Sequence, residues 1–161
     1  MKEKLNKAVA LRKNGDFKQS NAMLSDLAAL HPDDAIVNYQ CACSFDVIGE
    51  EAEAVTYYEK AITLGLKEED LKGALLGLGS SYRTLGEYEK SQAVFQEGIK
   101  QFPNDHAMKV FFAMTLYNLQ EHGQAMELLL TTILKITDDS DILAYQKAIS
   151  YYADELDRTW T

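Results

Sequence analysis

Three short Gly-acid-X turns recur along this chain at nearly constant spacing, and they constrain the fold more than any other feature. They begin at Gly15, Gly49 and Gly86, which places them 34 and 37 residues apart. A fourth copy without glycine, Gln120-Glu121-His122, follows after another 34 residues. A period of this length is typical of stacked helical hairpins. Such a stack presents a concave surface for other proteins and normally has no chemistry of its own.

The composition favours one all-α domain over residues 1–161. The chain has 161 residues, of which 47% are hydrophobic, and this suffices for a continuous core. The only two prolines, Pro32 and Pro103, stand at the ends of helical patterns. No apolar run approaches the roughly 20 residues that cross a bilayer. The first residues lack the apolar stretch of a secretory signal. We therefore expect a cytoplasmic protein with no membrane partner.

The net charge of −9 is unevenly distributed along the chain. Residues 1–30 hold six Lys/Arg and three Asp/Glu, a net charge of +3, whereas the other 131 residues hold ten and twenty-two, a net charge of −12. An acidic body repels phosphate backbones, so we expect no nucleic-acid partner. Two readings of the asymmetry stay open: it selects a partner, or it only keeps the surface soluble.

Each repeat is expected to be a helix, a short turn and a second helix. The four repeats span residues 1–34, 35–70, 71–105 and 106–138. In the first repeat, Gly15 provides the positive φ that ends a helix at low cost. Its second helix stops at Pro32, because proline cannot continue it. In the second repeat, residues 65–70 replace the proline exit and add three residues, which predicts a longer loop there.

One more helix is predicted over residues 140–158. Its apolar residues are spaced 3, 4, 3 and 4 apart, at Ile142, Tyr145, Ile149, Tyr152 and Leu156. Such a helix would cover the exposed core of the last repeat. Tyr151 and Trp160 exceed what a cap requires. The alternative that this leaves open is a structural homo-oligomer, assembled as a homodimer through the apolar C-terminal helix.

These repeats resemble the tetratricopeptide repeat over about residues 1–137. The residues that carry the resemblance are Leu78-Gly79, Phe112-Ala113 and Cys41-Ala42 in first helices, Tyr82 and Phe45 one turn later, and Ser20, Ala54, Ser91 and Ala125 in second helices. Small residues suit these positions because closely crossing helices leave no room for larger ones. Glu51 and His122 depart from the turn aromatic, and Leu66 and Thr137 from the exit proline. The resemblance implies a right-handed α-solenoid of four hairpins plus a capping helix, working as a protein-interaction scaffold.

The resemblance also implies where a partner protein would bind. In this family the groove is lined by the face of each first helix that points away from the second helix. The groove residues predicted on that face are Arg12, Tyr39, Cys43, Leu76, Ser80, Arg83, Val110, Met114 and Tyr117, together with Leu5, Val9, Lys13, Ile36, Asp46 and Asn118. Aromatic and Arg side chains are frequent binding hot spots. The alternative is that these residues only pack between neighbouring helices or against the C-terminal helix, which Met114 and Tyr117 are best placed to contact.

No catalytic, cofactor-binding or metal site is expected. His31, His106 and His122 fall at repeat junctions or a turn, and no nucleophilic triad or phosphate-binding glycine loop is recognisable. Cys41 and Cys43 point to different faces of one helix, so they do not pair, and because a second Cys pair or a nearby His is lacking we expect no zinc site. Members of this family that hold the acidic C-terminus of a chaperone use Lys, Asn and Arg, and the matching sites here, which include Leu5, Val9, Gln40, Gly73 and Gly77, carry too few such donors. We expect a non-catalytic chain whose partner is another protein.

Overall fold

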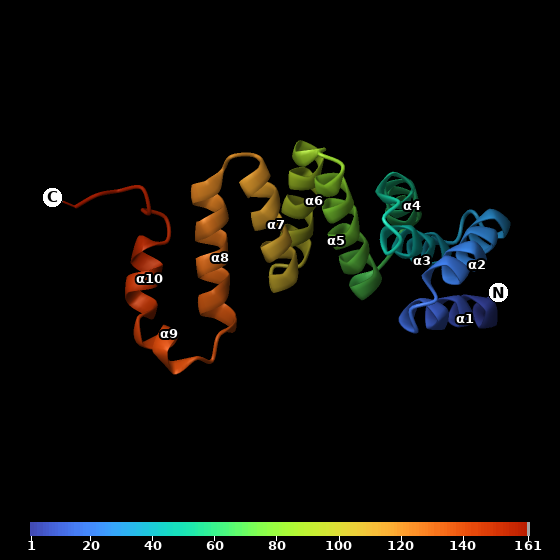
Figure 1. Cartoon of the computed structure of the whole chain (residues 1–161), viewed down its shortest axis with the longest axis horizontal. Helices are drawn as coiled ribbons and strands as arrows, with labels where there is room; N and C mark the ends of the chain where they lie inside the picture. Colours follow the sequence, from blue (N-terminus) through green and yellow to red (C-terminus); the bar gives the residue numbers. More distant parts are fainter. Residues whose placement is uncertain (161) are drawn as a thin grey trace. The chain divides into compact units, whose positions relative to one another are not determined.

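The computed structural model describes residues 1–160, which contain ten α-helices and no β-strand. The helices are α1 (Lys2–Lys13), α2 (Phe17–Leu30), α3 (Ala35–Asp46), α4 (Glu51–Leu64), α5 (Glu68–Thr84), α6 (Tyr88–Gln101), α7 (His106–Asn118), α8 (His122–Ile136), α9 (Ser140–Ala144) and α10 (Gln146–Tyr152) (Figure 1). They form two compact units, Met1–Glu87 with α1 to α5 and Tyr88–Thr161 with α6 to α10. The single domain predicted over residues 1–161 stays a prediction.

The four predicted turns share one backbone geometry. Gly86 has φ of 79°, and Gln120 adopts the same left-handed conformation with φ of 65° although it has a side chain. In each turn, one N–H donates to the carbonyl three residues earlier, and the next N–H donates to the carbonyl five residues earlier. The three-residue bonds join Gly15 to Arg12, Gly49 to Asp46, Gly86 to Arg83 and Gln120 to Tyr117. The five-residue bonds join Asp16 to Leu11, Glu50 to Phe45, Glu87 to Tyr82 and Glu121 to Leu116. This pair of bonds is the Schellman motif, which satisfies the last carbonyls of a helix. It turns the chain back, so that α1 packs on α2, α3 on α4 and α7 on α8.

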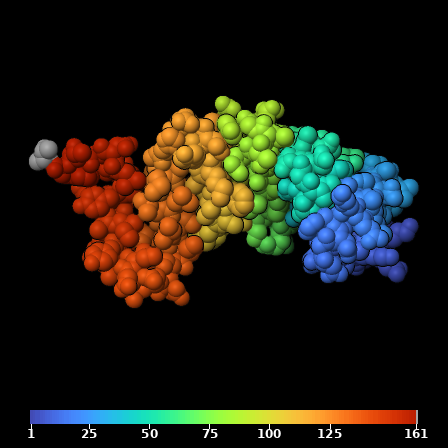
Figure 2. Space-filling model, in the orientation of Figure 1, coloured from blue at the N-terminus to red at the C-terminus, as the bar shows by residue number. Residues whose placement is uncertain are grey.

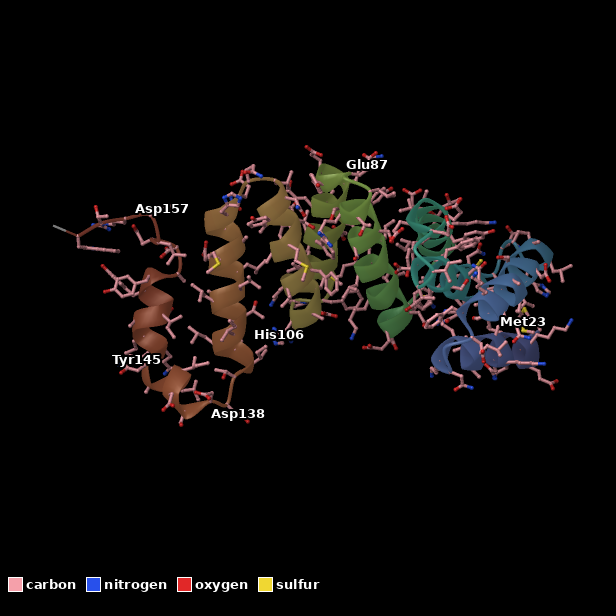
Figure 3. All side chains as sticks on the ribbon, viewed as in Figure 1. Met23, Glu87, His106, Asp138, Tyr145 and Asp157 are labelled. Atoms are coloured by element: carbon pink, nitrogen blue, oxygen red, sulfur yellow. The ribbon has the colours of Figure 1, made fainter. Side chains whose placement is uncertain are left out.

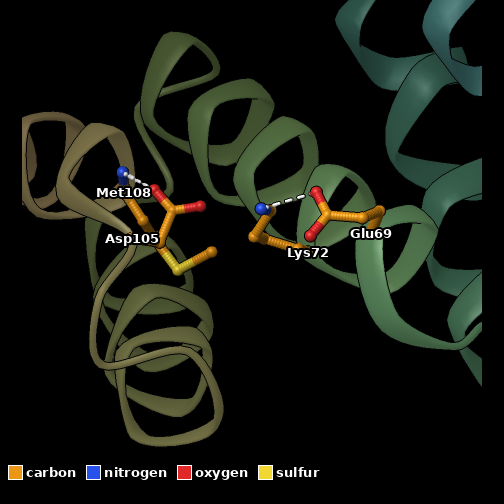
Figure 4. A network of polar contacts seen from close by, with 4 residues as sticks. All are labelled: Glu69, Lys72, Asp105 and Met108. Atoms are coloured by element: carbon orange, nitrogen blue, oxygen red, sulfur yellow. Dashed lines mark hydrogen bonds and ion pairs between the residues drawn. The ribbon is translucent and has the colours of Figure 1, made fainter.

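The two helices that follow a proline, α3 and α7, begin with the same hydrogen bonds. The carboxylate of Asp105 accepts the N–H of Met108 at 2.8 Å (Figure 4), and that of Asp34 accepts the N–H of Val37 at 2.9 Å. Six residues after each proline, a buried polar side chain donates to the proline carbonyl: Asn38 to Pro32, and Lys109 to Pro103. The cap and this second bond hold the loop against the first turn of α3 or α7.

The core of the first unit forms where helices cross closely. Ala8, Leu24, Leu27, Ala28, Val37 and Cys41 make one buried cluster. The Ser20 hydroxyl donates to the Ala8 carbonyl at 2.7 Å, which joins α2 to α1 at a buried position. Phe45 stacks on Tyr57 with ring centroids 5.5 Å apart. The small residues predicted at such crossings are therefore buried contacts between helices.

The second unit repeats this arrangement with other residues. Ala113, Leu116 and Ala125 form a buried cluster between α7 and α8. Phe95 of α6 is fully buried and its ring lies 6.1 Å from that of Phe112. The hydroxyls of Ser91 and Thr115 hydrogen-bond at 2.8 Å, which joins α6 to α7.

The longer loop predicted over residues 65–70 is wrong, because the extra residues lengthen a helix instead. Helix α5 begins at Glu68 and runs for 17 residues, whereas α3 has 12. Glu68, Glu69 and Asp70 stand in the first turn of α5, where their negative charges stabilise the positive end of the helix dipole. Lys72 pairs with Glu69 at 2.6 Å across this turn (Figure 4).

The single helix predicted over residues 140–158 is interrupted and ends early. Tyr145 leaves helical geometry, with φ of −105° and ψ of 10°, and separates α9 from α10, which stops at Tyr152. Only Ile142 and Ile149 of the apolar stripe are half-buried, while Tyr145, Tyr152 and Leu156 are exposed. Because short helices are marginal without tertiary packing, the small buried area does not sustain one continuous helix. Helix α10 contacts α8.

None of the helices within residues 1–160 has both the length and the apolar character that a membrane crossing requires.

We expect Gln120→Gly to stabilise the protein by about 0.5–1 kcal/mol, because glycine adopts the left-handed conformation without the cost that a side chain brings. The reverse change, Gly86→Gln, should destabilise by about 1 kcal/mol. A Cβ added at Gly86 meets no atom within 4 Å, so this cost comes from the backbone conformation alone. Urea unfolding of the two variants measures both effects, and unchanged stability in both would contradict this account of the turns.

Candidate peptide-binding groove

The first helices of the repeats in the first unit lie next to one another. Helix α1 contacts α3, and α3 contacts α5, as the predicted groove requires. A cleft of about 390 Å³ lies between α1 and α3. Its lining residues are Leu5, Asn6, Val9, Ala10, Lys13, Ile36 and Gln40. Four of the predicted groove residues therefore line this cleft together: Leu5, Val9, Lys13 and Ile36.

Arg12 connects α1 to α3 instead of pointing freely into the groove. Its Nη1 donates to the Gln40 carbonyl at 3.0 Å, and its Nη2 donates to Oε1 of the same residue at 2.6 Å. A planar guanidinium suits this two-point contact better than an ammonium would. Arg12 also opposes the rise in pKa of the Tyr39 hydroxyl and of the Cys43 thiol, which shows that its positive charge faces both groups.

Tyr39 and Cys43 lie in a polar cluster where α3, α4 and α5 meet. The Tyr58 hydroxyl donates to Oδ2 of Asp46 at 3.0 Å and lies 3.6 Å from Sγ of Cys43. The ring centroids of Tyr39 and Tyr58 are 6.3 Å apart. Burial is the main cause that raises the pKa of both tyrosine hydroxyls, of the Cys43 thiol and of the Asp46 carboxyl. Burial therefore opposes the ionisation of each group, and the thiol is a poor nucleophile.

Two glycines of α5 make room for these tyrosines. A Cβ built on Gly77 would overlap the ring and hydroxyl of Tyr58, and a Cβ on Gly73 would overlap the Tyr39 hydroxyl. The space beside each glycine is therefore filled by a tyrosine of the preceding repeat, and a larger side chain at either position would displace that tyrosine.

The other predicted residues of the first unit lie along α5. Leu76, Ser80 and Arg83 are all half-buried, and Arg83 stands in the last turn, where its charge favours the helix C-terminus. On the same helix, Tyr82 is buried, and its hydroxyl donates to the Glu59 carboxylate. Burial first, and then this hydrogen bond, raise the pKa of Tyr82 to about 12.

The second unit contributes the residues of α7. Val110 is half-buried, whereas Met114 is 42% exposed and Tyr117 is 63% exposed. The expected contact of Met114 and Tyr117 with the C-terminal helix does not cover them, since α10 contacts α8. The Tyr117 ring instead lies 4.9 Å from that of His122, at the start of α8. Met114 and Tyr117 are thus, like Ile36 and Lys13, exposed residues of the predicted groove.

The two cysteines remain reduced and buried or half-buried. Burial raises the pKa of Cys41 to about 11. Within residues 1–160, no three His, Cys, Asp or Glu side chains come close enough together to hold a metal ion.

A second cleft was missed by the sequence reasoning. It lies between α1 and α2, has a volume of about 700 Å³, and includes Lys4, Lys7, Met23, Leu27 and Leu30 among its lining residues. A signal for it exists in the sequence: α2 carries Met23 and Leu30 in addition to the buried stripe of Leu24, Leu27 and Ala28, so its apolar residues cover more than one face.

Gly77→Ala should destabilise the protein by about 1–2 kcal/mol, because overpacking against the buried Tyr58 ring outweighs the gain of about 1 kcal/mol in helix propensity. Gly73→Ala is the matched control: only the hydroxyl end of the half-buried Tyr39 must move, so its stability should stay within about 0.5 kcal/mol of wild type. Thermal or urea unfolding of both variants measures the difference. Equal changes in the stability of the two variants would show that the Tyr58 ring does not restrict the size of the residue at position 77.

Tyr58→Phe should destabilise by about 1–3 kcal/mol at neutral pH, because it leaves the half-buried Asp46 carboxylate without its donor. The pKa of Asp46 is already raised in the folded state, and this hydrogen bond holds it down, so the variant raises it further. For an acid with a raised pKa, stability is lost as pH rises through the folded value. The difference between wild type and variant should therefore grow with rising pH and shrink in acid.

Urea unfolding as a function of pH measures this effect, and the carboxyl resonance of Asp46 reports its pKa directly. Tyr117→Phe is the control, because the Tyr117 ring is largely exposed and the change should leave the pH profile unaltered. A constant difference at all pH values would assign the loss to packing alone.

The chain matches known proteins over most of its length. The family model described as Tetratrico peptide repeat matches residues 35–156. No curated protein matches the sequence. Among solved structures, YrrB, described as a TPR protein with an unusual peptide-binding site, is 18% identical with a TM-score of 0.71, covering 94% of this chain and 77% of YrrB.

Two further structures share the fold at similarly low identity. MamA, residues 41 to the end, from Desulfovibrio magneticus RS-1 is 14% identical with a TM-score of 0.75, covering 96% of this chain and 85% of that one. The APC/C hetero-tetramer Cut9–Hcn1 is 17% identical with a TM-score of 0.73, covering 91% of this chain and 29% of that one. These likenesses show the all-α solenoid fold, and together with the family match they confirm the resemblance: the chain belongs to the tetratricopeptide repeat family.

Proposed function

We propose that this chain is a non-catalytic interaction module of the cytoplasm that binds a peptide or helix of a partner protein on its first-helix face. In the first unit, that face is formed by α1, α3 and α5. The observation that carries the proposal is the cleft of about 390 Å³ between α1 and α3, at the place predicted for the groove. The family fold supports the coarser role of a protein-interaction scaffold.

The cleft has the chemistry of a site for an amphipathic segment. Leu5, Val9 and Ile36 provide apolar surface, and Lys13 and Gln40 border it with a charge and an amide. An amphipathic helix or extended peptide binds such a surface by burying one apolar face. For a short peptide we expect a Kd on the order of micromolar.

In the second unit, the first helix α7 exposes two residues of similar character, Met114 and Tyr117. Tyr is frequent among binding hot spots, and Met adapts its shape to different partners. The likeness to YrrB, a TPR protein with a peptide-binding site, supports a peptide as the ligand class.

The second candidate is a structural homodimer through the C-terminal helix. It is favoured by the exposure of Tyr151, Tyr152 and Trp160, whose rings contact one another but are not covered. It is opposed by charge, because two copies of the acidic residues 138–160 would face each other.

Peptide display on the immobilised chain, followed by calorimetric titration of the selected peptides, tests the proposed function. Ile36→Ala/Tyr117→Ala should weaken binding by about tenfold or more, since truncating an interface hot spot costs about 2 kcal/mol. Both side chains are exposed, so the variant should keep its circular dichroism and unfolding temperature.

The matched control is Leu64→Ala/Met126→Ala, which removes exposed apolar side chains of similar accessibility from α4 and α8. It should bind the selected peptides as wild type does. If the control loses binding and the groove variant keeps it, the binding surface lies on the second helices and the proposal is wrong.

A further inference from the structure

The cleft between α1 and α2, which we name the N-terminal cleft, is apolar with a basic rim. Its volume of about 700 Å³ is within the range of pockets that hold a bulky ligand group. Met23 and Leu27 line it, and Leu30, which also lines it, is 70% exposed. Lys4 and Lys7 stand at its rim on α1, with one acidic neighbour, Asp26. Residues 1–30, which form α1 and α2, carry a net charge of +3.

The chain after α8, residues 138–160, has the opposite character, and we name it the C-terminal arm. It exposes large apolar side chains along its whole length: Tyr145, Tyr151, Tyr152, Leu156 and Trp160. Its acidic residues, six against two basic ones, give it a net charge of −4. Asp138 and Asp157 lie near the two ends of the arm, and Tyr145 lies between them, at the junction of α9 and α10 (Figure 3).

The aromatic residues near the end of the arm form one exposed group. The Trp160 ring lies 5.4 Å from that of Tyr152 and 6.3 Å from that of Tyr151, and Arg158 sits 5.2 Å from the Trp160 centroid. Figure 2 shows the arm on the surface of the second unit, beside α8. A contiguous apolar group at half exposure is typical of an interaction surface.

We propose that the C-terminal arm of one copy binds in the N-terminal cleft of a second copy. Apolar surfaces match on both sides, since the aromatic group of the arm meets Met23, Leu27 and Leu30. The charges match as well: Asp154 and Asp157, beside the aromatic group, approach Lys4 and Lys7, whereas Glu155 pairs with Arg158 of the same arm at 3.6 Å. Opposite charges around an apolar centre set the partner and its orientation.

Charge also distinguishes this contact from a symmetric dimer. Two arms packed on each other would bring together two surfaces of net charge −4, whereas an arm in a cleft joins −4 to +3. The contact uses a different surface on each partner, so a pair of copies still has one free cleft and one free arm for further copies. Copies would therefore add head to tail, into short chains or a closed ring, and the association should weaken with salt.

Sedimentation velocity of two altered chains tests this contact. Lys4→Glu/Lys7→Glu disables the cleft and Tyr151→Ala/Trp160→Ala disables the arm; all four side chains are exposed, so both variants should fold. Wild type should associate increasingly from about 5 to about 500 μM at low salt. Each variant alone should stay monomeric. Their equimolar mixture should form a 1:1 dimer, because one variant keeps its arm and the other its cleft.

The control Lys60→Glu/Lys100→Glu makes the same charge change on α4 and α6 and should associate as wild type does. Adding Asp154→Lys/Asp157→Lys to the cleft variant should restore association. A wild-type mass that stays monomeric over this range would overturn the proposal. So would a cleft variant that dimerises alone, since that result assigns a symmetric arm-to-arm contact, or a mixture that remains monomeric. None of these outcomes depends on peptide binding by the groove.

Discussion

The left-handed turn between the two helices of each repeat is the constraint on which the other features depend. One residue with positive φ and two backbone hydrogen bonds, donated by consecutive N–H groups, reverse the chain within three residues. This reversal places the second helix against the first and leaves the opposite face of the first helix for its neighbours. The contacts of α1 with α3 and of α3 with α5, and hence the cleft between α1 and α3, follow from the same turn used repeatedly.

Packing between repeats divides the predicted groove into structural and accessible residues. Arg12 hydrogen-bonds Gln40, and Tyr39 and Cys43 belong to the polar, half-buried cluster around Tyr58 and Asp46. These residues hold neighbouring helices together. Ile36, Met114 and Tyr117 are more exposed, and they are the residues with surface available for a partner.

The first and last repeats of an array each lack one neighbour, so they expose surface that inner repeats bury. In this chain the surfaces exposed at the two ends differ in charge. The first repeat leaves an apolar cleft with lysines at its rim. The last one is followed by an arm that covers part of α8 but exposes its aromatic residues. A polar cap would keep both ends inert. In the contact that we propose, the opposite charges of the two apolar ends bring copies together, and this contact would give the charge asymmetry of the sequence a physical role.

The sequence by itself determined the helical hairpins, their turns and the family, because these depend on local signals: glycine at a positive φ, proline at an exit, small residues at a crossing. Gln120 was recognised as a turn only through its spacing, since neighbouring turns define the geometry it must adopt. Tertiary structure alone decided which residues of the predicted face remain accessible. Whether Tyr39 or Tyr117 is free depends on what the next helix brings against it, here Gly73 in one case and an open surface in the other. The same holds for residues 140–158: a regular apolar stripe predicts one helix, but its length is set by the surface that α8 offers for burial.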